Sequence, residues 1–136
     1  MPYVERHYRV LSDRNHRAIA GLSMGGAQTL AIALAQPKDF AYVGVFSSGF
    51  LGKGGDNEST NQKIKQSIGS PEVAKGLKLL WFATGRDDFL IKNTRGTVDA
   101  FKSNGTSPVF VETTGGHTWI NWQLYLRDFA PQLFRD

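Results

Sequence analysis

The stretch Arg17-Ala18-Ile19-Ala20-Gly21-Leu22-Ser23-Met24-Gly25-Gly26 joins two patterns that together decide the fold. Its first half is a short apolar run, which predicts a buried strand. Residues 27–36, which follow, are rich in Ala and Leu and close at Pro37, so they predict a helix. Between strand and helix, residues 21–25 match the pattern G-x-S-x-G, which in this context is typical of a reactive serine on a tight turn.

The turn around Ser23 makes steric demands that the sequence meets. A serine at a sharp strand-to-helix turn has strained backbone angles, so its neighbours Gly21 and Gly25 are expected because they lack bulk. Gly26 would let the helix approach the sheet closely. The turn lifts the hydroxyl near the positive end of the helix dipole, where the amide of Met24 would point at a developing oxyanion. The alternative is a serine that only caps the helix, but with strand and helix both in place we favour the catalytic interpretation.

Short apolar runs alternate with longer helical patterns along the rest of the chain. Further strands are predicted at residues 42–46, 77–83 and 109–112, and further helices at residues 58–68, 91–103 and 119–134. This alternation predicts an α/β fold with about four parallel strands and flanking helices. The length of 136 residues suits one domain, which we expect to span residues 1–136.

The composition excludes several other classes of protein. The chain has no cysteine, so neither a disulfide framework nor a cysteine-based zinc site is possible. Its 16 basic and 12 acidic side chains give a net charge of +4, but the basic residues are scattered, so we expect no nucleic-acid partner. The longest apolar runs, such as residues 79–83, are far shorter than the roughly 18 residues of a membrane span, so we expect no membrane partner either.

A serine nucleophile needs a base within hydrogen-bond reach and an acid that orients the base. Of the three histidines, His7 and His16 precede the serine in polar stretches, where we expect surface positions. His117 follows the fourth predicted strand, in Gly115-Gly116-His117-Thr118-Trp119. Because an open α/β sheet places its reactive groups at the carboxyl ends of its strands, we predict that His117 is the base.

Two neighbouring aspartates follow the third predicted strand, in Thr84-Gly85-Arg86-Asp87-Asp88-Phe89. Either carboxylate could orient His117. Asp88 adjoins the apolar run Phe89-Leu90-Ile91, which indicates partial burial, whereas we expect Asp87 to pair with Arg86 or solvent. We favour Asp88, and the resulting chain order Ser…Asp…His is that of α/β hydrolases.

These segments resemble the esterase D-like family, also named "putative esterase", which includes the feruloyl and acetylxylan esterases of carbohydrate esterase family 1. The resemblance rests on residues 17–26, on Pro37, Phe40, Val43 and residues 47–49, and on residues 85–90 and 115–119. The family's acid stands three residues after the glycine, which is the position of Asp88. The resemblance implies a truncated α/β-hydrolase fold and a reaction that needs no metal or organic cofactor.

The resemblance covers nearly the whole chain but only the second half of the family's domain. It implies that the usual N-terminal strands are lacking, and with them the second oxyanion donor. Losing one such donor typically costs on the order of 10²–10³ in rate. The strand before Ser23 would then become an exposed edge, and we expect the chain to form a homo-oligomer through that edge.

Together these patterns predict a serine carboxylesterase that works through an acyl-enzyme. Ser23 would attack the ester carbonyl, while His117 takes the serine proton and returns it to the leaving alcohol. Asp88 would hold the imidazole, and the backbone of Met24 would form part of the oxyanion hole.

The resemblance implies feruloyl or acetyl esters of plant polysaccharide, or small aryl esters, as substrates. Trp119 and Trp122 would line an aromatic acyl or sugar pocket, or else belong to the core, because their spacing puts them on one helix face. Two alternative functions stay open. One is a catalytically impaired remnant that acts as a binding module, and the other is an acyltransferase that passes the acyl group to a sugar.

Overall fold

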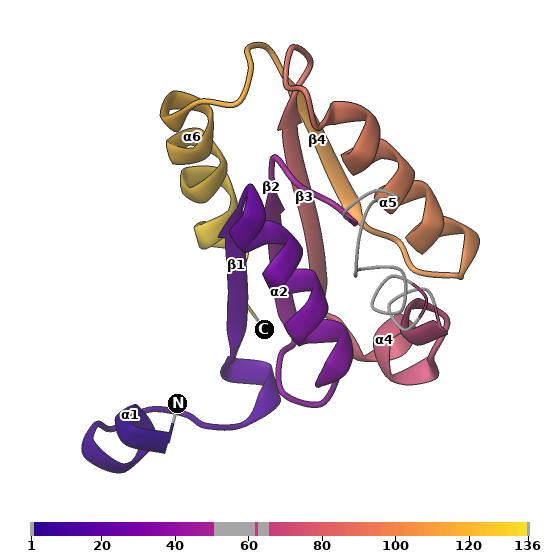
Figure 1. Cartoon of the computed structure of the whole chain (residues 1–136). Coiled ribbons are helices and arrows are strands. Elements are labelled where there is room, and N and C mark those ends of the chain that lie inside the picture. Colours follow the sequence, from indigo (N-terminus) through magenta and orange to yellow (C-terminus); the bar gives the residue numbers. More distant parts are fainter. Residues whose placement is uncertain (1, 51–61, 63–65, 136) are drawn as a thin grey trace.

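The computed structural model describes residues 2–50, 62 and 66–135, and within them four parallel strands form one sheet. The strands are β1 (Ala18–Leu22), β2 (Tyr42–Phe46), β3 (Leu79–Gly85) and β4 (Val109–Thr113). They lie in the sheet in the same order as in the sequence, and each pairs in parallel with the next. The carboxyl ends of all four strands therefore lie at the same end of the sheet (Figure 1).

Helices cover both faces of this sheet. The helices are α1 (Pro2–His7), α2 (Met24–Ala35), α4 (Pro71–Gly76), α5 (Ile91–Ser103) and α6 (Trp119–Phe129), with 3-10 turns at Arg14–His16 and Ala130–Gln132. Helices α2, α4 and α5 pack on one face, α6 packs on the other, and α1 lies apart from the sheet (Figure 1). The predicted helix over residues 58–68 falls mostly outside the described residues. In the described part of the chain, no helix is both long and apolar enough to cross a lipid bilayer.

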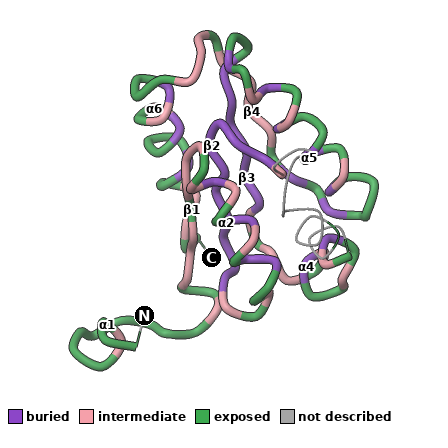
Figure 2. Tube along the Cα trace, viewed as in Figure 1, coloured by how far each residue is buried: buried purple, intermediate pink, exposed green. Residues whose placement is uncertain are grey.

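Two apolar clusters hold the three layers together. The larger cluster joins one sheet face to α2, α4 and α5 through side chains that include Leu30, Leu34, Val43, Val45, Val73, Phe82, Val98 and Phe101. The smaller cluster joins the other face to α6 through Phe46, Trp81, Ala83, Tyr125 and Phe129. Strands β2 and β3 are buried almost throughout, whereas β1 and β4 are only half-buried because they form the two edges (Figure 2).

The outer edge of β1 has no strand beside it among the described residues. The amide of Ser23 donates to the Phe46 carbonyl at 2.9 Å, and the amide of Ala41 donates to the Arg17 carbonyl at 3.2 Å. Since successive residues of a strand point their backbone groups to opposite sides, those of residues 18, 20 and 22 face the open edge.

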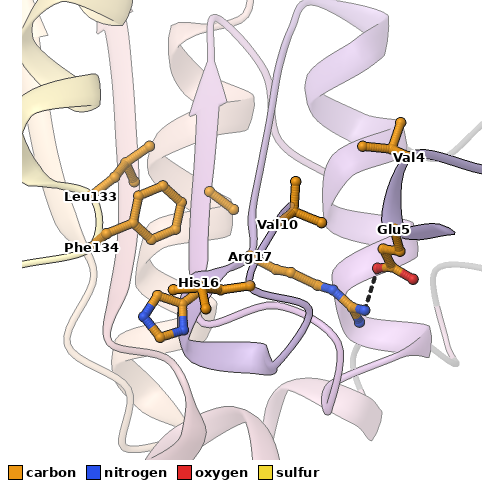
Figure 3. A pocket seen from close by; sticks show the side chains of 9 residues that line it. Val4, Glu5, Val10, His16, Arg17, Leu133 and Phe134 are labelled. Carbon is orange, nitrogen blue, oxygen red and sulfur yellow. Dashed lines mark hydrogen bonds and ion pairs between the residues drawn. The ribbon is translucent and has the colours of Figure 1, made fainter. Parts of the chain in front are cut away.

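An apolar groove of about 480 Å³ lies at the amino end of β1, opposite the end that bears Ser23. It is lined by Val4, Glu5, Val10, Leu11, His16, Arg17, Ala18, Leu133 and Phe134 (Figure 3). An ion pair between Arg17 and Glu5 ties α1 to the start of the strand. Because Ala18 begins β1 and lines the groove, the groove lies next to the amino end of the open edge.

Candidate active site

Ser23 lies on the turn between β1 and α2, with backbone angles that glycine adopts more readily than serine. Its φ is 52° and its ψ is −124°, and it serves as the N-cap residue of α2 without a side-chain capping bond. The predicted alternative, a serine that only caps the helix, is therefore wrong. Such a conformation costs of order 1–3 kcal/mol and persists only where the surroundings fix it.

Close packing against neighbouring atoms explains two of the three glycines around this turn. A Cβ on Gly21 would lie 2.2 Å from the Gly25 carbonyl oxygen, and a Cβ on Gly26 would lie 2.5 Å from the Ser48 Cβ. A Cβ on Gly25 would meet no described atom within 4 Å. The expectation that Gly25 must lack bulk is therefore wrong. The positions without room for a side chain are Gly21, before the turn, and Gly26, in the helix after it.

His117 connects the serine to a buried carboxylate. Its Nε2 lies 2.9 Å from the Oγ of Ser23, and its Nδ1 lies 2.9 Å and 3.1 Å from the two carboxylate oxygens of Asp88. The side chain of Asp88 has no exposed surface, and that of His117 is 19% exposed. Because a carboxylate only accepts, Nδ1 donates to Asp88, which leaves Nε2 free to accept the serine proton.

The other predicted candidates lie away from this chain of hydrogen bonds. Asp87 is exposed, whereas Asp88 is 2% exposed and also accepts from the amide of Leu90 at 2.9 Å. His7 is exposed and stacks on Tyr3, and His16 is exposed and pairs with Asp13. The prediction that both histidines lie on the surface is confirmed.

Backbone and amide contacts hold the loop that bears His117 against the loop that bears Asp88. Gly115 has a φ of 82°, and its carbonyl accepts from the amide of Asp87 at 3.1 Å. Asn121, which is 7% exposed on α6, donates to the carbonyls of Thr114 and Gly116 at 3.1 Å and 3.0 Å. The sequence interpretation missed Asn121, and a single asparagine in a helical pattern gives no signal of this role.

Aromatic rings flank the imidazole. The ring of Phe89 lies 4.6 Å from that of His117, and the ring of Trp122 lies 4.9 Å away at 90°. Trp119 contacts Trp122 at 5.1 Å. Phe89 and Trp119 are 75% and 68% exposed, whereas Trp122 is only partly exposed. The two predicted tryptophans thus lie in one aromatic row beside the histidine, and only Trp119 presents most of its surface to solvent.

The electrostatics of the site favour negative charge next to Ser23 and a neutral Tyr125 phenol near Asp88. The Met24 amide is the first of α2, so it has no partner within the helix and lies at the positive end of its dipole. Burial raises the pKa of Tyr125, and the charge of Asp88 adds to this rise although the hydrogen bond with Thr113 opposes it. No group of three or more potential metal ligands occurs among the described residues.

Known proteins resemble this chain in sequence. A family model described as "Putative esterase" matches residues 1–133. The chain is 27% identical over 136 residues to an endo-1,4-beta-xylanase/feruloyl esterase of Xylanibacter ruminicola, covering 99% of this chain and 16% of that protein. It is also 27% identical to an acetyl esterase of Caldicellulosiruptor saccharolyticus, covering 88% of this chain and 54% of that protein. The chain thus spans about half or less of the length of these relatives.

Solved structures share the fold. A ferulic acid esterase matches with a TM-score of 0.75 and 26% identity, over 93% of this chain and 54% of that chain. A fluorophosphonate-binding serine hydrolase of Staphylococcus aureus matches with a TM-score of 0.82 and 19% identity, over 99% of this chain and 60% of that chain. The parallel sheet with its flanking helices is therefore a part of the α/β-hydrolase fold, as predicted.

Proposed function

Because the chain belongs to the esterase family described as "Putative esterase", we propose that it is a serine carboxylesterase with Ser23, His117 and Asp88 as its catalytic residues. The observation that supports this most directly is the chain of hydrogen bonds from Ser23 Oγ through the imidazole to the buried carboxylate. A strained, half-buried serine bonded to a histidine in this way has the arrangement of an activated nucleophile.

The first step forms an acyl-enzyme. The Oγ of Ser23 attacks the ester carbonyl carbon while Nε2 of His117 takes the hydroxyl proton. The resulting imidazolium is stabilised by the carboxylate of Asp88, which also keeps the ring in the required tautomer. The tetrahedral intermediate holds its negative charge on the former carbonyl oxygen, where the amide of Met24 at the start of α2 donates a hydrogen bond. The intermediate collapses as His117 protonates the leaving alcohol and the carbon–oxygen bond to it breaks.

The second step regenerates the enzyme. A water molecule enters the place of the alcohol and loses a proton to Nε2 of His117 as it attacks the acyl carbon. The bond to Ser23 Oγ then breaks, the serine regains its proton from the imidazolium, and a carboxylic acid leaves. Each proton passes through one nitrogen that lies 2.9 Å from the serine oxygen, within the reach that general base catalysis requires.

The substrates proposed are acetyl or feruloyl esters carried by plant polysaccharide. Two relatives named an acetyl esterase and a xylanase/feruloyl esterase support this substrate class. The exposed rings of Phe89 and Trp119 lie in the aromatic row beside His117, and they offer flat apolar surfaces on which an aromatic acyl group or a sugar ring could stack.

Hydrolysis of p-nitrophenyl acetate tests the proposal. We expect the wild-type chain to release p-nitrophenol and Ser23→Ala to fall to the background rate. Ser103→Ala is the matched control, because Ser103 is an exposed serine at the end of α5. A fluorophosphonate probe, which phosphonylates activated serines, should label the wild-type chain and Ser103→Ala but not Ser23→Ala.

Two results would contradict the proposal. Equal hydrolysis and no labelling in the wild-type chain and Ser23→Ala would favour a binding module without catalysis. Release of p-nitrophenol that is accelerated by added sugars, with an acylated sugar as the product, would favour the acyltransferase.

A further inference from the structure

Trp122 has a hydrogen bond that links α6 to the tip of β2. Its Nε1 donates to the Oγ of Ser47 at 3.0 Å, and its ring stands perpendicular to the imidazole of His117 at 4.9 Å. Ser47 is fully buried. The indole is therefore held at one side by a buried hydroxyl while its edge-to-face contact restrains the histidine at the other.

Ser47 occupies a position that a serine adopts only at a cost. Its φ is 48°, and its amide donates to the Ala83 carbonyl at 2.8 Å. Glycine would adopt this conformation without strain, so a serine kept there is an outlier of the kind found at functional sites. What serine adds over glycine is the side chain whose Oγ accepts the bond from Trp122.

The same strand tip also holds the nucleophile. The carbonyl of Phe46, the residue before Ser47, accepts the amide of Ser23 at 2.9 Å. Two consecutive residues at the end of β2 thus fix the backbone of the serine and the side chain of the tryptophan. The short segment Phe46-Ser47 therefore contacts both the turn that bears Ser23 and the indole that packs on His117.

Contacts from Asn121 and Asp87 hold the backbone of the loop that bears His117, but the orientation of the imidazole also depends on the rings beside it. His117 follows Gly115 and Gly116, and its second aromatic neighbour, Phe89, is 75% exposed and has no hydrogen-bonding group. Of these two rings beside His117, Trp122 is the one that is partly buried and held by a hydrogen bond to Ser47. Asp88 fixes one nitrogen of the ring but leaves rotation about that hydrogen bond to the rings on either side.

We propose that Ser47 and Trp122 are positioning residues. They hold the His117 imidazole at hydrogen-bonding distance from Ser23 by anchoring the indole to the tip of β2. The proposal rests on the proposed esterase function of the same site. It assigns to Trp122 a role through the histidine, in addition to the predicted contact with substrate.

Kinetics on p-nitrophenyl acetate test the proposal with three variants and a matched control. Trp122→Phe keeps an aromatic ring but loses the N–H. Ser47→Ala loses the hydroxyl and keeps the strained backbone, whereas Ser47→Gly loses the hydroxyl and relieves the strain. Trp81→Phe is the control, because Trp81 belongs to the same apolar cluster and its ring packs on Phe46, Tyr125 and Phe129. We expect kcat to fall on the order of tenfold in the three variants with little change in KM, and to stay at the wild-type value in Trp81→Phe.

The stability of the variants separates positioning from packing. We expect Ser47→Gly to melt at a higher temperature than Ser47→Ala, because glycine relieves the positive φ, while both lose kcat equally. If kcat follows the melting temperature across all four variants, Trp81→Phe included, the role is only structural and the proposal is overturned. Wild-type kcat in Trp122→Phe or in Ser47→Ala would overturn it as well.

A measurement without turnover keeps this proposal separable from the esterase function. Relaxation dispersion of the 15N and 13C signals of the His117 ring reports whether the imidazole exchanges between orientations. We expect a single orientation in the wild-type chain and in Trp81→Phe, and exchange in Trp122→Phe because the neighbouring ring has lost its anchor. A single orientation in Trp122→Phe would overturn the positioning role. Exchange in Trp122→Phe together with equal hydrolysis by wild type and Ser23→Ala would support the positioning role and contradict the esterase.

Discussion

Asp87 and Asp88 are adjacent in the sequence, yet their carboxylates lie in different surroundings. Asp87 is exposed, and Asp88 is buried against Nδ1 of His117. We expect Asp88→Asn to lower kcat for p-nitrophenyl acetate roughly 10⁴-fold, because an amide would stabilise the wrong imidazole tautomer. Asp87→Asn is the matched control and should keep the wild-type kcat. Equal losses in both variants would contradict the assignment of the acid.

At the residue scale, the sequence allowed the hydrogen-bonded serine, histidine and aspartate to be predicted, but not the contacts that support them. Ser23, Asp88 and His117 each follow a short apolar run, so the rule that parallel strands end at one edge brings them together. Ser47 and Trp122 are 75 positions apart, and although the spacing from Trp119 placed Trp122 on a helix face, no sequence pattern predicts its hydrogen bond to Ser47. Their contact depends on how α6 packs against β2, and periodicity does not specify that distance.

The approach of α2 to the sheet depends on a single missing methyl group. A Cβ on Gly26 would lie 2.5 Å from the Cβ of Ser48, which is buried, whereas Gly25 faces open space. We expect Gly26→Ala to lower the free energy of unfolding by about 1–3 kcal/mol because the helix must move. Gly25→Ala should raise it by about 0.5–1 kcal/mol through helix propensity. Urea unfolding measures both, and a destabilised Gly25→Ala would contradict this account.

A bidentate ion pair ties α5 to the edge strand β4. Arg95 donates from Nε and Nη2 to the two carboxylate oxygens of Glu112 at 2.8 Å and 2.7 Å, and this hydrogen bonding holds the pKa of Glu112 below its ordinary value. A lowered carboxylate pKa stabilises the fold above the ordinary pKa, and that contribution is lost as the pH falls through the lowered value.

We therefore expect Glu112→Gln to melt below the wild-type chain at pH 7 and to match it at acid pH, once Glu112 is protonated. Because both side chains are partly exposed, the difference should be modest and should shrink with added salt. Asp99→Asn, which removes an exposed carboxylate from the same helix, is the control. A difference between wild type and Glu112→Gln that grows toward low pH would have the wrong sign for this mechanism.

At the element scale, the sequence predicted four strands in the right places, and errors occurred where neighbouring segments decide the boundary. The third strand was expected over residues 77–83 but spans Leu79–Gly85. Leu77 ends α4, and at the other end Thr84 and Gly85 stay paired with β4. Helix α2 begins at Met24 rather than at residue 27, because the turn at Ser23 places the two glycines in the helix despite their low propensity.

For the whole molecule, the open edge of β1 leads us to expect self-association. Backbone groups of residues 18, 20 and 22 face outward from this edge. The apolar groove lies at the amino end of the strand (Figure 3). Such an edge is a template for pairing with another strand, and a second copy supplies one. We expect light scattering after gel filtration to give a mass above 15.0 kDa that falls on dilution.

Substitutions at Ala20 test whether this edge is the contact. Ala20→Pro removes the outward N–H at the middle of β1, so it should yield a monomer, whereas Ala20→Gly keeps the donor and should stay associated. A wild-type chain that is a stable monomer at every concentration would exclude self-association. An oligomer that persists in Ala20→Pro would place the contact elsewhere.

The order of the strands has a consequence for how the protein is made. Strands β1 to β4 join the sheet in the order in which a ribosome synthesises them, so each new strand finds its partner already present. His117 comes after the last strand, and the helix that supports its loop comes later still. Under the proposed function, a nascent chain that has not yet exposed His117 therefore holds the serine without its base. On that proposal, Ser23 gains its base only after all four described strands have been synthesised.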